Sequence, residues 1–88
     1  MNILERYRID TRKVPEEVVE KASDIVGDIE RGKNLFMNYR AQRLNFNRNV
    51  ISVQVGKRWR LVADDSTGSL VWKALLSHEA YSKYIRRI

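Results

Sequence analysis

The first half of the chain places its hydrophobic residues at helical spacing. Pro15 suits a first helical turn, and the acidic pair Glu16 and Glu17 favours the positive end of a helix dipole. The hydrophobic positions then recur every three or four residues, at Val18, Ala22, Ile25 and Ile29, with Val19 and Val26 beside them. Gly32 provides a left-handed stop. The pattern predicts a helix from Pro15 to just before Gly32.

A second helix is expected directly after this stop. Asn34 can cap it, and it would run to about Leu44. Its buried side would consist of Leu35, Phe36, Tyr39 and Leu44. Because only Gly32 and Lys33 separate the two segments, we expect a hairpin of two helices that covers one layer of the core.

From Val50 the hydrophobic period changes to two, which is typical of strands. One face would carry Ile51, Val53, Val55, Trp59, Leu61 and Ala63. A three-residue connection over Gly56, Lys57 and Arg58 keeps this face hydrophobic, because it pairs Val55 with Trp59, whereas a two-residue turn would mix charge into it. The sequence therefore predicts a β-hairpin whose opposite face holds Ser52, Gln54 and Arg60.

Three further elements complete the predicted fold. Residues 64–68 form a dense turn signal, and a strand over 70–76 would carry Leu70, Trp72, Ala74 and Leu76 on one side and Lys73 on the other. Lys73 would then join Gln54 and Arg60, so we expect the basic residues to form one continuous face. Ser77 can cap a short helix from His78 to about Arg87, and Ile3–Ile9 alternates like an edge strand. We expect one α+β domain over residues 1–88, a two-helix hairpin packed on a small, mainly antiparallel sheet in the order β-α-α-β-β-β-α.

Basic residues are concentrated in one window of the chain. The formal net charge is +6, and residues 40–60 account for it, because they include Arg40, Arg43, Arg48, Lys57, Arg58 and Arg60 and no acidic residue. Such a concentration attracts phosphate backbones or an acidic protein. The plainer alternative is an ordinary solvated face.

Composition limits the other chemistry. The absence of cysteine excludes disulfides and thiolate metal sites, and with a single histidine we expect neither a metal nor another cofactor. No stretch reaches the roughly 18 hydrophobic residues of a membrane span, and the first residues do not have the basic-then-hydrophobic order of a signal sequence. We therefore expect a cytoplasmic protein without a membrane partner.

The second half of the chain resembles the RelE/ParE toxin superfamily of type II toxin–antitoxin systems. Residues 50–56 followed by 58–62 resemble that family's Tyr-Ser-Val-Arg-Val-Gly-x-x-Tyr-Arg-Leu-Val hairpin, and residues 76–81 resemble its closing strand and His-x-x-Tyr ending. Arg43-Leu44 stands where many members have Lys-Leu. The departures are Asn45-Phe46, where a glycine is usual, and Trp59 in place of tyrosine. With the two preceding helices, the resemblance covers about residues 15–85.

This resemblance implies a toxin that acts on RNA. Many relatives are ribonucleases that bind mRNA, often on the ribosome, in a groove of the sheet and cut it without a metal, while others act on DNA gyrase. Such a toxin is held by an antitoxin, for which the basic window favours an acidic protein. The function expected here is metal-independent endoribonuclease activity. The alternatives are a non-catalytic RNA- or protein-binding regulator on the same fold and a gyrase-inhibiting toxin.

The resemblance also suggests which residues do the chemistry. Arg60 matches the family's Tyr-Arg arginine and would stabilise the phosphate, His78 would move a proton, and Tyr81 would stack on a base or donate a proton. The remaining RNA contacts are expected from Arg43, Arg48, Gln54, Lys57, Arg58 and Lys73. Structural alternatives stay open at two positions. His78 can form a hydrogen bond to the backbone at the start of a helix, and Tyr81 can pack against the core or its rim.

Overall fold

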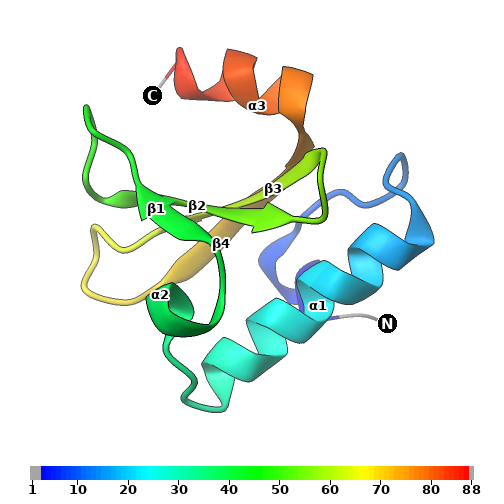
Figure 1. The fold of residues 1–88 in the computed structure, drawn as a ribbon, viewed down its shortest axis with the longest axis horizontal. Helices are drawn as coiled ribbons and strands as arrows, with labels where there is room; N and C mark the ends of the chain where they lie inside the picture. The colour runs from blue at the N-terminus through cyan, green and yellow to red at the C-terminus, as the bar shows by residue number, and fades with distance from the viewer. Residues whose placement is uncertain (1–2, 88) are drawn as a thin grey trace.

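A computed structural model describes residues 3–87 as an antiparallel sheet with helices on both faces (Figure 1). The strand order in the sheet follows the chain, β1-β2-β3-β4. The elements are η1 (Ile3–Tyr7, a 3-10 helix), α1 (Glu16–Glu30), α2 (Leu35–Asn38), β1 (Ala41–Arg43), β2 (Val50–Val55), β3 (Trp59–Asp64), β4 (Val71–Ser77) and α3 (His78–Ile85). None of the described helices is long and apolar enough to cross a membrane. The expected α+β class and antiparallel sheet are confirmed.

The β2–β3 hairpin has the expected register. Val55 pairs with Trp59 and Val53 with Leu61, so the connection has three residues, and Gly56 takes a positive φ of 63°. Because side chains alternate along a strand, the sheet has an inner face toward α1 and an outer face toward α3. Figure 1 shows these two helices on opposite sides of the sheet.

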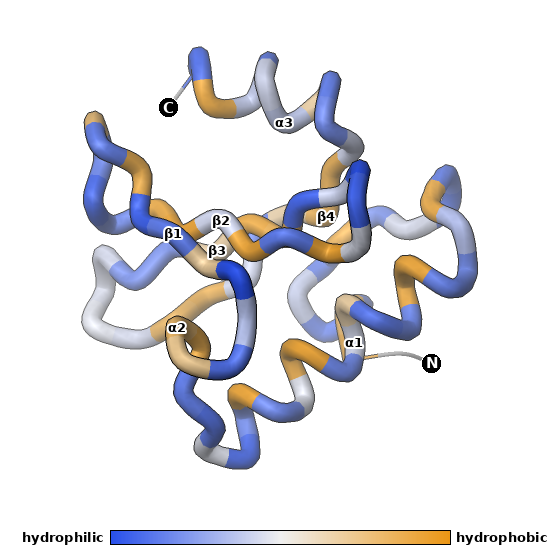
Figure 2. Tube along the Cα trace, in the orientation of Figure 1, coloured by the Kyte–Doolittle hydropathy of each residue, from blue (hydrophilic) through white to orange (hydrophobic). Residues whose placement is uncertain are grey.

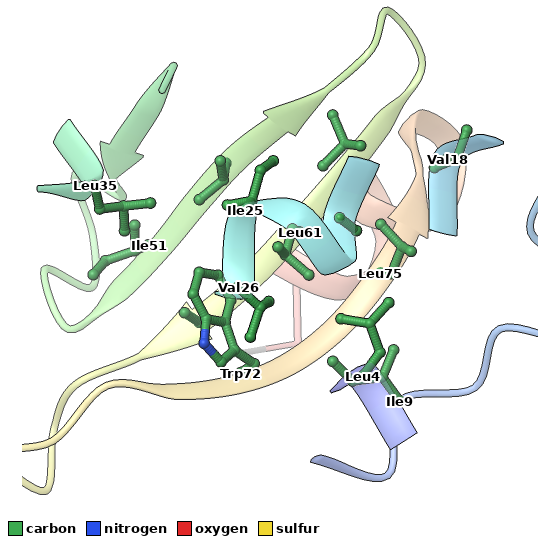
Figure 3. Packing of buried hydrophobic residues seen from close by; sticks show 14 residues of the cluster. Leu4, Ile9, Val18, Ile25, Val26, Leu35, Ile51, Leu61, Trp72 and Leu75 are labelled. Atoms are coloured by element: carbon green, nitrogen blue, oxygen red, sulfur yellow. The ribbon is translucent and has the colours of Figure 1, made fainter. Parts of the chain in front are cut away.

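The core lies between α1 and the inner face (Figure 3). Ala22 and Val26 of α1 are fully buried, and Trp72 of β4 is 2% exposed. Figure 2 shows hydrophobic positions recurring along α1, as the helical spacing predicted. The outer face has buried positions too, Val50, Ser52 and Val62, and α3 packs over β3 and β4 on this face.

The expected second helix is wrong beyond its first turn. Asn34 caps it as predicted, since its side chain accepts a hydrogen bond from the Met37 N–H at 3.0 Å, but α2 ends at Asn38 and the chain continues as β1. Phe36, expected to be buried, is 47% exposed. Tertiary pairing overrides the local preference for a helix here. Residues 40–43 form backbone hydrogen bonds with the edge of the buried strand β2, which would otherwise be unpaired.

The expected opening strand is also wrong. Ile3–Tyr7 is a 3-10 helix, and Leu4 and Ile9 are both buried in the core. Arg8 turns the chain with a φ of 58°, and the Ile9 N–H donates to the Leu4 carbonyl. Burying Leu4 and Ile9 together requires the segment to fold back on itself, which an extended strand cannot do.

A β-bulge changes the side-chain pattern of β4. Val62 pairs with Ala74 while the next residue, Ala63, pairs with Trp72, so Lys73 is the extra residue between them. The expectation that Leu70, Trp72, Ala74 and Leu76 share one side is therefore wrong. Trp72 and Leu75 face the core, whereas Ala74 and Leu76 lie on the outer face.

Candidate functional site

A groove of about 540 Å³ runs over the outer face of the sheet beside α3. Three adjacent strands supply its floor, because Gln42 pairs with Ser52 across β1 and β2, and Gln54 pairs with Arg60 across β2 and β3. Tyr81 of α3 forms one wall. The other lining residues are Tyr39, Arg40, Ala41 and Leu44. The hairpin register predicted from the sequence is what places Gln54 and Arg60 on this floor.

Arg60 and Tyr81 contact each other within the groove. The guanidinium carbon of Arg60 lies 5.8 Å from the centroid of the Tyr81 ring, within the range of a cation–π contact. Within residues 3–87, neither Arg60 nor Arg40 takes part in an ion pair, and no carboxylate lines the groove. The groove therefore carries two uncompensated positive charges beside an aromatic ring.

Tyr39, another groove-lining residue, connects the groove to α1. The Tyr39 hydroxyl donates to the Asp28 carboxylate, and this hydrogen bond is the main reason that the pKa of Asp28 is lowered and the pKa of Tyr39 is raised. Next to Tyr39, the Arg40 carbonyl accepts from the Gln54 N–H at 3.0 Å. Tyr39 thus holds its phenol proton in a structural bond, whereas the Tyr81 hydroxyl has no partner within the described chain.

A second hollow of similar size, about 530 Å³, lies along α1. Three carboxylates line it, from Glu16, Glu20 and Asp24, together with Val14 and Val19. Negative charge repels a phosphate backbone, so this hollow does not suit nucleic acid. Of these two hollows, the basic groove is the one with the charge for a polyanion.

Arg43 lies on the other side of the sheet. It pairs with Ile51 of the inner face, and its guanidinium donates two hydrogen bonds to the Asp65 carboxylate, at 2.7 and 3.1 Å, and one to the Arg48 carbonyl at 2.7 Å. Its guanidinium carbon also lies 5.5 Å from the Phe36 ring centroid. These contacts give Arg43 a structural role in closing the β1–β2 loop, where Arg48 is exposed.

Replacing Arg43 with alanine is expected to lower thermal stability by a few degrees in a pH-dependent way. The Arg43 hydrogen bonds lower the pKa of Asp65. Their contribution is therefore complete above the ordinary aspartate pKa of about 3.9 and is lost as the pH falls through the lowered pKa. Thermal unfolding of wild type and variant, followed by circular dichroism from about pH 7 to about pH 2, should give melting temperatures that converge in acid. A constant difference would contradict the assignment.

The other sequence-predicted RNA contacts lie outside the groove. Lys57 and Arg58 are exposed at the β2–β3 turn and border a shallow hollow beside Pro15 and Lys21 of the α1 side. Lys73 is the exposed bulge residue, and its charge adds to the Ser66 hydrogen bonds that lower the pKa of Asp64. Only Gln54, Arg60 and Tyr81 of the nominated residues come together, so the basic window does not form one continuous face.

His78 begins α3 but does not line the groove. Its backbone N–H donates to the Arg58 carbonyl at 2.8 Å, and its carbonyl accepts from the Ser82 hydroxyl at 3.1 Å. The residue is exposed, one helical turn before Tyr81. His78 therefore lies near the β2–β3 turn, outside the cluster formed by Arg60 and Tyr81.

Six of the nine groove residues were not nominated from the sequence, and the two that matter most for binding are Gln42 and Arg40. Gln42 was missed because residues 34–44 were expected to be helical. A helix there could not pair Gln42 with Ser52 of the neighbouring strand. Arg40 was part of the basic window, and the signal that would have placed it is the extended pairing of residues 40–43 with β2. Residues 3–87 contain no group of His, Cys, Asp or Glu side chains arranged to hold a metal.

The helices and the four-stranded antiparallel sheet together form a small α+β domain. A chain of the RelB–RelE antitoxin–toxin complex from Methanococcus jannaschii has the same fold, with a TM-score of 0.73 at 13% identity over 85% of this chain and 87% of that chain. No curated protein matches the chain significantly. The ParE-like toxin domain family matches residues 16–83. The chain therefore belongs to this toxin family of the RelE/ParE superfamily.

Proposed function

We propose that this toxin domain binds single-stranded RNA in the outer-face groove and cleaves it without a metal. The observation that carries the proposal is the pair Arg60 and Tyr81, an unpaired guanidinium 5.8 Å from an aromatic ring in a groove without carboxylates. Guanidinium groups bind phosphates, and aromatic rings stack on unpaired bases. The two groups together match one nucleotide with its phosphate.

The groove residues suit cleavage by internal transfer. The ribose 2′-oxygen attacks the adjacent phosphorus, a bond from phosphorus to the 2′-oxygen forms, and the bond to the 5′-oxygen breaks. Arg60 stabilises the negative charge that accumulates on the phosphate oxygens. The leaving 5′-oxygen takes a proton from the Tyr81 hydroxyl, and the proton released by the 2′-hydroxyl restores it through water. The products are a 2′,3′-cyclic phosphate and a 5′-hydroxyl.

We expect the purified protein, alone or with translating ribosomes, to cleave RNA in the presence of EDTA. The reason is that the groove offers cationic and phenolic groups in place of metal ligands. Gel electrophoresis and mass spectrometry of the fragments should show 2′,3′-cyclic phosphate or 3′-phosphate ends. Cleavage that EDTA abolishes, or fragments with 3′-hydroxyl ends, would overturn the proposed chemistry.

A binding module without cleavage is the second candidate. It is favoured by one observation, which is that the groove lining contains neither histidine nor a carboxylate to act as a general base. RNA that binds but stays intact, both free and on ribosomes, would support this candidate. Growth arrest with intact RNA would instead point to a protein target such as DNA gyrase.

We also propose that an acidic antitoxin covers the groove. The net charge of +6 and the unpaired Arg40 and Arg60 favour an acidic partner. The structural neighbour with TM-score 0.73 comes from an antitoxin–toxin complex, which supports a partner of this kind. A small gene next to this one that encodes an acidic helical protein would supply the partner for co-purification.

A further inference from the structure

One groove residue, Gln54, has a side-chain amide that is held by a hydrogen bond to the backbone. Its Nε2 donates to the Gly56 carbonyl at 3.0 Å. A carbonyl oxygen only accepts hydrogen bonds, so the nitrogen of the amide must face it and the oxygen must face elsewhere. The side chain is half-buried on the groove floor, next to Arg60 across the strand pair. Gln54 therefore holds Oε1 ready as an acceptor for a ligand.

The other polar side chains of the groove floor, from Gln42, Ser52 and Arg60, do not supply a fixed acceptor. Arg40 and Arg60 can only donate, and the Ser52 hydroxyl can rotate to donate or accept. Gln42 is exposed and its amide has no hydrogen bond within the described chain, so it can turn either way. Gln54 also borders a hollow of about 420 Å³ beside α1, together with Gly56.

We infer that the groove selects cytosine over uracil, through a hydrogen bond from the exocyclic N4 amine of cytosine to Gln54 Oε1. The inference rests on the proposed RNA-binding function. Arg60 and Tyr81 hold the neighbouring phosphate and the ring of the base, which brings the edge of the base toward the floor. Cytosine presents its N4 amine there. Uracil presents a carbonyl oxygen in the same position, which meets the lone pairs of Oε1 and is disfavoured.

The test compares pentanucleotides that differ in one base. We would use 2′-O-methyl uridine pentamers with cytosine, uracil or 2-pyrimidinone at the centre, because the methyl group blocks cleavage and the last base is cytosine without its amine. Fluorescence anisotropy should show about 3- to 10-fold tighter binding for cytosine than for uracil, the size of one hydrogen bond. With 2-pyrimidinone most of this advantage should disappear.

Protein variants assign the preference to one side chain. Gln54→Leu removes the acceptor at similar volume, and the cytosine to uracil ratio should fall to about one, the value without that bond. The matched control is Gln42→Leu, which removes the mobile glutamine and should weaken both complexes equally, leaving the ratio intact. A ratio that persists in Gln54→Leu, or that Gln42→Leu abolishes, would overturn the assignment.

The outcomes separate this inference from the function on which it rests. Equal binding of the cytosine and uracil pentamers by wild type overturns base selection but leaves RNA binding in place. Failure to bind any pentamer overturns RNA binding by the isolated groove, and base selection with it. If circular dichroism shows that Gln54→Leu does not fold, the 2-pyrimidinone comparison on wild type decides the question alone.

Discussion

Replacing Arg60 with alanine is expected to lower the rate of RNA cleavage by about 10²- to 10³-fold, the usual cost of losing a group that stabilises transition-state charge. RNA affinity should also weaken, by about tenfold, because a charged hydrogen bond to phosphate is lost. In cells, expression of wild type should slow growth and the variant should relieve it. The rate is measured in single-turnover cleavage assays with saturating protein.

A matched arginine variant separates this effect from a simple loss of charge. Arg12→Ala removes the same formal charge, and Arg12 is 88% exposed, paired with Asp10 and outside the groove. It should leave cleavage close to wild type. The logarithmic salt dependence of RNA binding should flatten by about 0.7 in Arg60→Ala, the value for one phosphate contact, and stay unchanged in Arg12→Ala. Equal effects of the two variants would reduce Arg60 to part of a diffuse positive surface.

The sequence predicted the parts of the fold that hydrophobic spacing alone controls. The stripe from Val18 to Ile29 defined α1, and alternation around Gly56 defined the hairpin and its register. Each pattern reports burial of one face of an element against one neighbouring layer, so the spacing of hydrophobic residues along the chain is sufficient to predict the element. They also place Gln54 and Arg60 side by side, which is the part of the site that sequence alone could locate.

Elements that depend on distant partners could not be predicted in this way. Residues 41–43 are a strand only because β2 offers an open edge, and Ile3–Tyr7 folds back only because Leu4 and Ile9 fit under α1 and the sheet. The bulge at Lys73 adds one residue and reverses the side-chain pattern of β4. Neither a local period nor residue preference reports these contacts.

The same limit explains the dispersal of the basic window. Six cations close together in sequence suggested one surface, but the β1–β2 pairing turns Arg43 inward to Asp65, and the hairpin turn carries Lys57 and Arg58 to the far end of β2. A run of basic residues in a sequence therefore indicates the sign of the charge that a partner would carry. It does not indicate which of those residues would contact the partner. Arg40 and Arg60 remain together because both lie beside Gln54 in the sheet.

Replacing Tyr81 with phenylalanine is expected to lower the cleavage rate by about 10²-fold while leaving RNA affinity nearly unchanged. The variant keeps the ring that stacks beside Arg60 and removes only the hydroxyl, which has no partner within the described residues.

His78→Gln should change the rate by less than about threefold, well below the usual effect of a positioned proton-transfer group, because His78 lies outside the groove lining.

Tyr84→Phe is the matched control for Tyr81→Phe, since it removes the other phenol of α3, which does not line the groove. Single-turnover rates and anisotropy on the same RNA separate the chemical step from binding for all three variants. A large rate loss in His78→Gln with a normal rate in Tyr81→Phe would transfer the proton donation to His78. Such a transfer would stay within one turn of α3, because residues three apart on a helix are neighbours on its surface.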